Sequence, residues 1–213
     1  MALRSSLLIA IPASIGLIFM GFPIIQTLLE RGAFSPEATQ TTVRTLQWYA
    51  LGLASMCAVK VLANTLYALH DTWTPVRSAA VSLAANVAIN FIIVWPMKLP
   101  GLALSTSISS TLNSVQLYLA VRRRIGRSEK RLRDWAFRVI VASLAMGLTA
   151  QGTWILGMRL FGPAGTLVSI AWLLTAVTAG GASFFGFGWL LGVEEIRQMV
   201  RWFLTKSPAS NKN

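Results

Sequence analysis

The chain has 213 residues, of which 54% are hydrophobic and only 12% are charged, and its formal net charge is +12. Soluble domains carry about 25% charged residues, so this composition favours lipid as the main solvent. A nucleic-acid-binding domain seldom combines a basic surface with so much unbroken hydrophobicity, whereas the positive loops of a membrane protein account for both features.

Six segments have the roughly 20 mostly apolar residues that a membrane-spanning helix needs. They are residues 6–29, 46–69, 78–95, 101–121, 135–158 and 164–191. The first is too long for the hydrophobic region of a signal peptide, and no small-residue cleavage site follows it, so we interpret it as a span. We therefore predict an all-α, polytopic integral membrane protein with six transmembrane helices.

The positive charges are divided unequally between the two sides of these spans. Six spans place both termini on one side, and that side receives most of the 19 Lys and Arg residues. The other side receives only Arg31, Arg44, Lys98 and Arg159. The positive-inside rule therefore predicts that both termini are cytoplasmic.

A basic run at residues 122–134 divides the predicted spans into a four-helix part, 1–121, and a two-helix hairpin, 135–191. We expect this run to be a cytoplasmic linker that binds anionic lipid headgroups. In residues 192–213, apolar positions recur at helical spacing from 193 to 204, which predicts an amphipathic helix in the headgroup plane, followed by a polar tail.

Lys60 places a positive charge inside the second predicted span. Asn64, Tyr67 and Asp71 follow at positions that share its helical face. Lys60 would lie about 16 Å from Asp71 along the helix, near the middle of the bilayer, where a charge costs about 2.5–3.5 kcal/mol on insertion scales. The stripe is expected to line a cavity that meets an anionic or polar substrate. The structural alternative is a lysine that pairs with another helix or snorkels.

The segment HDTWTPVR, residues 70–77, predicts a tight turn between two helices. Asp71 can accept hydrogen bonds from exposed backbone N–H groups, Thr74 is the predicted N-cap of the next helix, and Pro75 suits its first position. Together with Arg77, these residues form either a hinge or gate or a purely structural turn.

Polar side chains also mark single faces of the third and fourth spans. Asn86 and Asn90 share one face, and the fourth span carries Ser105, Ser109, Asn113 and Gln116 close to another. Interhelical hydrogen bonds are their commonest use in lipid. Together with Lys60, they also suggest three helices converging on a wet interior. The sequence shows no nucleophile–base constellation, metal-ligand cluster or phosphate loop, so we expect no enzyme, no cofactor and no metal.

Four blocks of the sequence form a further pattern: ERGAFSPEAT (30–39), YALGL (49–53), KVLANTLYALHDTWTPVR (60–77) and PGLALSTSISSTLN (100–113). They resemble the MurJ (MviN) family, the lipid II flippases of bacterial peptidoglycan synthesis. The family pattern KVLAPxFYAxxDTxTPV is matched at positions that include Lys60, Tyr67 and Asp71, while Asn64 replaces the usual proline.

The resemblance implies a portion of a fourteen-span transporter of the MOP exporter superfamily in the bacterial cytoplasmic (inner) membrane. In that family two lobes alternate access to a cationic cavity for the pyrophosphate of lipid II, and the last two spans form a groove for the polyprenyl tail. This chain would be the C-terminal portion, with the first lobe lost or supplied by a separate chain. The residues implied to line the cavity are Lys60, Asn64, Tyr67, Asn86, Asn90 and Asn113.

Two other functions are compatible with the same residues. One is the export of another lipid-linked oligosaccharide by a member of the same superfamily. The other is a non-transporting membrane scaffold that recruits partners through the basic run and the C-terminal helix.

Overall fold

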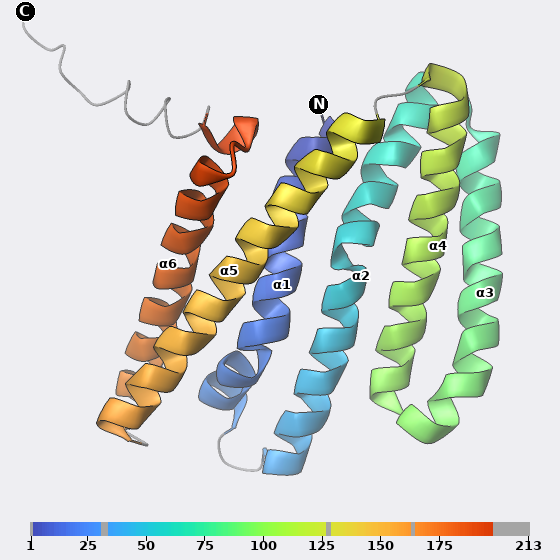
Figure 1. The fold of residues 1–213 in the computed structure, drawn as a ribbon. Helices are drawn as coiled ribbons and strands as arrows, with labels where there is room; N and C mark the ends of the chain where they lie inside the picture. Colours follow the sequence, from blue (N-terminus) through green and yellow to red (C-terminus); the bar gives the residue numbers. More distant parts are fainter. Residues whose placement is uncertain (1, 31–33, 127–128, 163–164, 198–213) are drawn as a thin grey trace, which may run out of the picture.

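The computed structural model describes residues 2–30, 34–126, 129–162 and 165–197. Within these ranges it contains six long helices: α1 (Ala2–Leu29), α2 (Pro36–Ala68), α3 (Trp73–Met97), α4 (Leu99–Ile125), α5 (Glu129–Phe161) and α6 (Thr166–Leu190). They run alternately up and down, and the N-terminus lies at the same end as the start of α5 and the end of α6 (Figure 1). The prediction of an all-α fold is confirmed.

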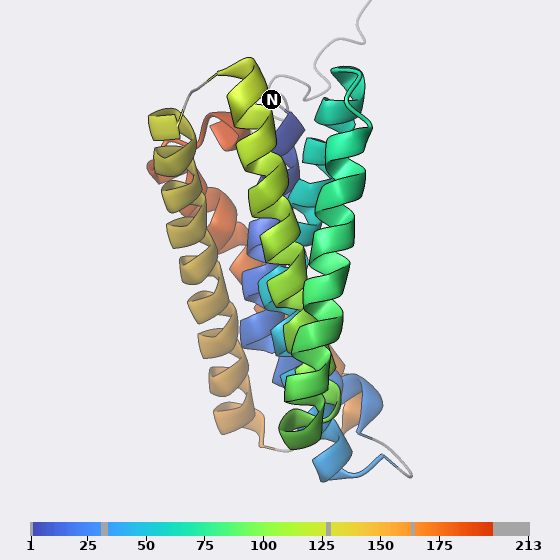
Figure 2. The same ribbon diagram turned by 90° about the vertical axis from the view of Figure 1, so that its right-hand side faces the viewer.

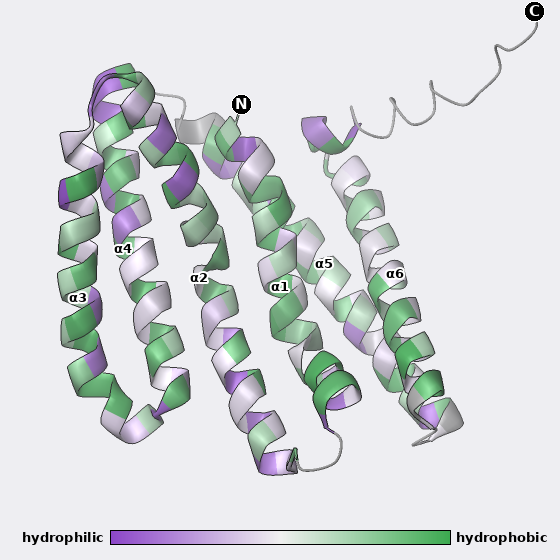
Figure 3. Cartoon of the chain, turned by 180° about the vertical axis from the view of Figure 1, so that it is seen from behind, coloured by the Kyte–Doolittle hydropathy of each residue, from purple (hydrophilic) through white to green (hydrophobic). Residues whose placement is uncertain are grey.

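Five of these helices, all except α4, are long and apolar enough to cross a membrane. Green, hydrophobic residues predominate along the helices in Figure 3, with purple, hydrophilic residues at their ends and along α2, α3 and α4. The serine, threonine and asparagine residues of α4 lower its hydropathy. A multi-span membrane protein is therefore confirmed, with five rather than six spans supported by length and composition.

The second helix begins at Pro36, earlier than residue 46, where its apolar run starts. Ser35 is the N-cap, and its Oγ accepts a hydrogen bond of 3.2 Å from the Ala38 backbone N–H. Pro36 occupies the first turn, where a missing N–H costs nothing, and Glu37 complements the positive end of the helix dipole. These local signals lengthen the helix beyond its membrane-spanning part.

The predicted basic linker at 122–134 is wrong in its extent, because most of it is helical. Arg122, Arg123 and Arg124 form the last turn of α4, and α5 already begins at Glu129. Arginine is a good helix former, and positive charges are favourable at a helix C-terminus. Helix α4 ends at its C-cap, Gly126, whose φ of 76° suits a glycine and few other residues.

The helices pack in the order α3, α4, α2, α1, with α5 and α6 lying against α1 (Figures 1 and 2). Leu8 and Met20 of α1 belong to two clusters of buried side chains that otherwise come from α5, α6 and the segment after α6. The predicted boundary between 1–121 and 135–191 is therefore not a gap in packing, since α1 joins both parts.

Small residues allow α2 and α4 to approach closely. A Cβ atom placed on Gly52 would lie 2.5 Å from Ser107 Oγ and 2.7 Å from Ser107 Cα. Nearby, the hydroxyl groups of Ser55 and Thr111 are 3.1 Å apart and share a hydrogen bond. In a membrane, such close packing and interhelical hydrogen bonds replace the hydrophobic effect as the source of helix association.

Candidate functional site

The predicted stripe on α2 is an open helix face. Lys60, Asn64 and Tyr67 are all exposed. The neighbouring helices contact other faces of α2: the α1 side receives the Gln47 side chain, which donates to Ile18 O at 3.1 Å, and α4 packs on the side of Gly52 and Leu66. The structure thus presents an ammonium, an amide and a phenol together on a surface not covered by α1 or α4.

The asparagines of α3 and α4 form a separate polar seam. Asn86 Nδ2 donates to Ser109 Oγ at 3.1 Å, and Asn90 Nδ2 donates to Asn86 Oδ1 at 3.1 Å. Ser105 Oγ donates to Asn90 Oδ1. At the hairpin end of the seam, Ser78 Oγ donates to Asn113 Oδ1 at 2.7 Å.

This seam does not converge with the Lys60 stripe, because α4 lies between α3 and α2. The predicted site residues therefore fall into two groups. Lys60, Asn64 and Tyr67 form an open stripe, whereas Asn86, Asn90 and Asn113 are engaged in joining α3 to α4.

The hairpin between α2 and α3 is organised by Asp71, which is buried. Its Oδ1 accepts a hydrogen bond of 3.0 Å from the backbone N–H of Thr74. The prediction that Thr74 is the N-cap is wrong: α3 begins at Trp73, so Thr74 and Pro75 lie within its first turn. The carboxylate of Asp71 reaches that turn from outside the helix and performs the capping instead.

A residue that the sequence pattern did not single out completes this hairpin. Arg124 Nη2 lies 2.6 Å from Asp71 Oδ2 and links the end of α4 to the turn. Hydrogen bonds from the Thr74 side chain and backbone hold the pKa of Asp71 below its ordinary value. Burial opposes them, and the Arg124 charge makes a smaller contribution that also lowers the pKa. Asp71 is the one acidic residue between Glu37 and Glu129, which is the signal that could have identified this pair. Arg77 is exposed on α3.

At the same end of the bundle, α1, α5 and the segment after α6 meet around Trp135. Trp135 Nε1 donates to Glu195 Oε2 at 2.8 Å, and the Arg4 guanidinium lies 5.9 Å from the centre of the Trp135 ring. Val193 and Ile196 are buried in the same cluster.

The described part of the predicted amphipathic segment therefore packs on protein, and its apolar side is not free to face lipid as predicted. Residues 198–213 of that prediction lie outside the described residues.

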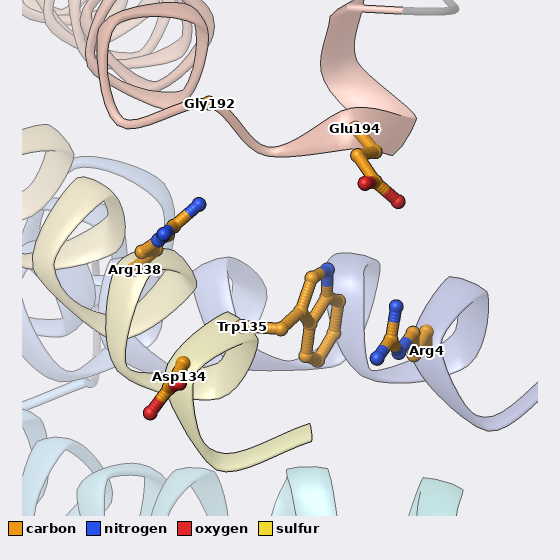
Figure 4. A pocket seen from close by; sticks show the side chains of 6 residues that line it. All are labelled: Arg4, Asp134, Trp135, Arg138, Gly192 and Glu194. Carbon is orange, nitrogen blue, oxygen red and sulfur yellow. The ribbon is translucent and has the colours of Figure 1, made fainter. Parts of the chain in front are cut away.

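Beside Trp135 is a cavity of about 250 Å³ that no sequence motif indicated (Figure 4). Its lining comes from α1, α5 and the turn after α6: Arg4, Asp134, Trp135, Arg138, Gly192 and Glu194. Within the described part of the chain, no group of three or more His, Cys, Asp or Glu residues is placed to hold a metal ion.

Comparison with known proteins gives one consistent family. The family model described as lipid II flippase MurJ matches residues 1–176. A probable lipid II flippase MurJ from Rickettsia prowazekii is 28% identical over 193 residues, which cover 90% of this chain and 38% of that protein. The lipid II flippase MurJ of Burkholderia cenocepacia is 30% identical over 196 residues, covering 89% and 37%.

The fold is similar to a solved structure of lipid II flippase MurJ in an inward closed conformation. The TM-score is 0.73 at 23% identity, and the match covers 93% of this chain and 38% of that one. The chain thus spans well under half the length of the relatives that it matches.

Proposed function

The chain belongs to the lipid II flippase MurJ family, and on that premise we propose that it supplies the C-terminal portion of a flippase for lipid II. In this proposal it lies in the bacterial cytoplasmic membrane with both termini in the cytoplasm. The excess of Lys and Arg at the end of the bundle that holds the N-terminus supports this orientation.

We count α4 as a sixth span in this proposal. Its 27 residues would extend about 40 Å, more than the roughly 30 Å hydrocarbon core. Four hydroxyl groups of α4 donate to backbone carbonyls three or four residues earlier; they belong to Thr106, Ser109, Thr111 and Ser114. Ser109 also accepts a hydrogen bond from Asn86 of α3, and Asn113 accepts one from Ser78 of α3. These polar groups are therefore hydrogen-bonded within the protein, as a bilayer demands.

The observation that carries the transport role is the open Lys60 stripe. An ionisable residue deep in a span is costly and is generally found where it faces a cavity or a partner. Neither α1 nor α4 covers the Lys60 side chain, which is exposed. Asn64 and Tyr67 continue the same polar face toward the hairpin between α2 and α3. A cationic lining of this kind suits the phosphates of a polyprenyl-pyrophosphate substrate, with a further lobe closing the opposite side of the cavity.

The experiment is complementation of a strain depleted of its own flippase. The chain would be expressed with the remaining N-terminal spans of the Burkholderia relative, and lipid II exposed on the outer face would be quantified. We expect restored exposure with wild type and Lys60→Arg, and loss with Lys60→Ala. Arg44→Ala is the matched control, because Arg44 is exposed on the same helix but on the opposite face.

Equal activity of Lys60→Ala and wild type would remove Lys60 from substrate binding. If the wild-type chain and its N-terminal partner are both present in the membrane and no lipid II is exposed, the flippase assignment is contradicted.

A further inference from the structure

Arg138 lines the cavity beside Trp135, and its guanidinium group and that of Arg197 both approach Gly192. A Cβ atom placed on Gly192 would lie 3.4 Å from Arg197 Nη2 and 3.6 Å from Arg138 Nη1. Both distances are ordinary van der Waals contacts, and the φ of 72° at Gly192 is what favours glycine here. Figure 4 shows the Arg138 side chain directed toward Gly192, with Arg4 on the far side of Trp135.

Two positive charges beside the same glycine repel each other, and an anion between them would offset this repulsion. Within the described part of the chain, Arg197 has only long contacts, of 3.4 Å from Nε and Nη2 to Trp189 O. Among the described residues Arg138 forms no ion pair. The geometry around Gly192 is therefore that of an anion cradle with planar, multidentate donors, which suit phosphate oxygens.

The position of the cradle indicates which phosphate would reach it. It lies where α5 begins and α6 ends, and Phe137 and Leu190, close to it in sequence, are 67% and 75% exposed. Large exposed apolar side chains at this point of a membrane helix face acyl chains. A group at the Gly192 cradle would therefore sit at the depth of the lipid headgroups.

We propose that Arg138 and Arg197 bind the phosphodiester of a membrane phospholipid at Gly192, a site distinct from the Lys60 stripe. Two carboxylates, those of Asp134 and Glu194, also line the cavity, and their negative charge disfavours a ligand that carries several negative charges. Asp134 points away from Arg138 in Figure 4, while Glu194 lies across the cavity near Arg4. A singly charged phosphodiester is accordingly favoured over a phosphomonoester or a pyrophosphate.

The test is native mass spectrometry of the whole chain, purified in detergent and titrated with dihexanoyl phosphatidylglycerol. We expect one saturable lipid, and about tenfold weaker binding in Arg138→Gln and in Arg197→Gln, since each removes one charge-assisted contact. Arg133→Gln is the control at the same end of α5, and Arg159→Gln is the control at its other end. Both residues are exposed and neither is among the nearest neighbours of Gly192, so neither change should alter binding.

Three outcomes would overturn the proposal. Equal weakening by Arg133→Gln would reduce the effect to general surface charge. Displacement of the lipid by inorganic phosphate at a similar concentration would indicate a site for free phosphate. Unchanged binding in both cavity variants would exclude the cradle. If Arg138→Gln does not fold, Arg138→Lys and Arg197→Gln provide the same comparison. None of these results depends on transport of lipid II.

Discussion

Arg124 Nη2 lies 2.6 Å from Asp71 Oδ2, and this ion pair fastens the last turn of α4 to the hairpin between α2 and α3. The same carboxylate caps α3 through the Thr74 N–H. One buried side chain thus connects three helices at one end of the bundle. The hairpin can move relative to α4 only if this ion pair breaks or if the last turn of α4 moves with it.

The first prediction concerns the order of destabilisation at this link. Asp71→Ala removes both the cap and the ion pair, whereas Arg124→Gln removes only the pair and leaves the cap in place. We expect the melting temperature in detergent to fall most for Asp71→Ala and less for Arg124→Gln. Arg123→Gln, an exposed neighbour in the same turn, should melt like wild type. Equal melting of Asp71→Ala and Arg124→Gln would show that the cap adds nothing.

Acid should weaken the same link. The pKa of Asp71 in the folded chain lies below its ordinary value of 3.8. A lowered folded-state pKa stabilises the fold above the ordinary value, and this contribution is lost as the pH falls through the folded-state pKa. We therefore expect melting temperatures of wild type and Asp71→Asn to differ at neutral pH and to converge at pH values below about 3.8. A constant difference across that range would contradict the lowered pKa.

Two glycines with different surroundings, one between α2 and α4 and one on an open part of α5, should respond in opposite ways to substitution by alanine. Gly52→Ala places a methyl group 2.7 Å from the backbone of Ser107 and should destabilise the fold by about 1–3 kcal/mol. Gly152→Ala on α5 meets nothing within 4 Å and should stabilise its helix by about 0.5–1 kcal/mol. Unfolding titrations in mixed detergent would measure both. A neutral Gly52→Ala would mean that the two helices separate freely.

The α3–α4 seam predicts a modest and local cost for losing an asparagine. Asn86→Ala removes the interhelical hydrogen bond to Ser109, at about 0.6 kcal/mol, and also the bond that Asn86 accepts from Asn90 within α3. Asn64→Ala removes an exposed amide on α2 and should leave stability unchanged. The same unfolding titrations compare the two. A loss of stability in Asn64→Ala as large as in Asn86→Ala would show that the Lys60 stripe is not an open face.

Sequence reasoning was most accurate where a feature depends on residues close along the chain. The apolar runs predicted the helices, and the shared face of Lys60, Asn64 and Tyr67 follows directly from helical periodicity. It was less accurate at helix ends, where Ser35 starts α2 early and helical arginines shorten the predicted linker. There a single cap or a charge at the helix terminus outweighs hydropathy averaged over a long window.

The sequence by itself determined that this is a helical membrane protein with a charged residue inside a span, because burial in lipid requires long apolar helices whatever their neighbours. Only the tertiary structure decided which polar residues meet. It placed α4 between the Lys60 stripe and the Asn86 seam, paired Asp71 with Arg124, and brought Arg138 to Arg197 at Gly192. Side-chain periodicity specifies the face of a helix, but the partner of that face depends on helix order and rotation, which packing between distant segments selects.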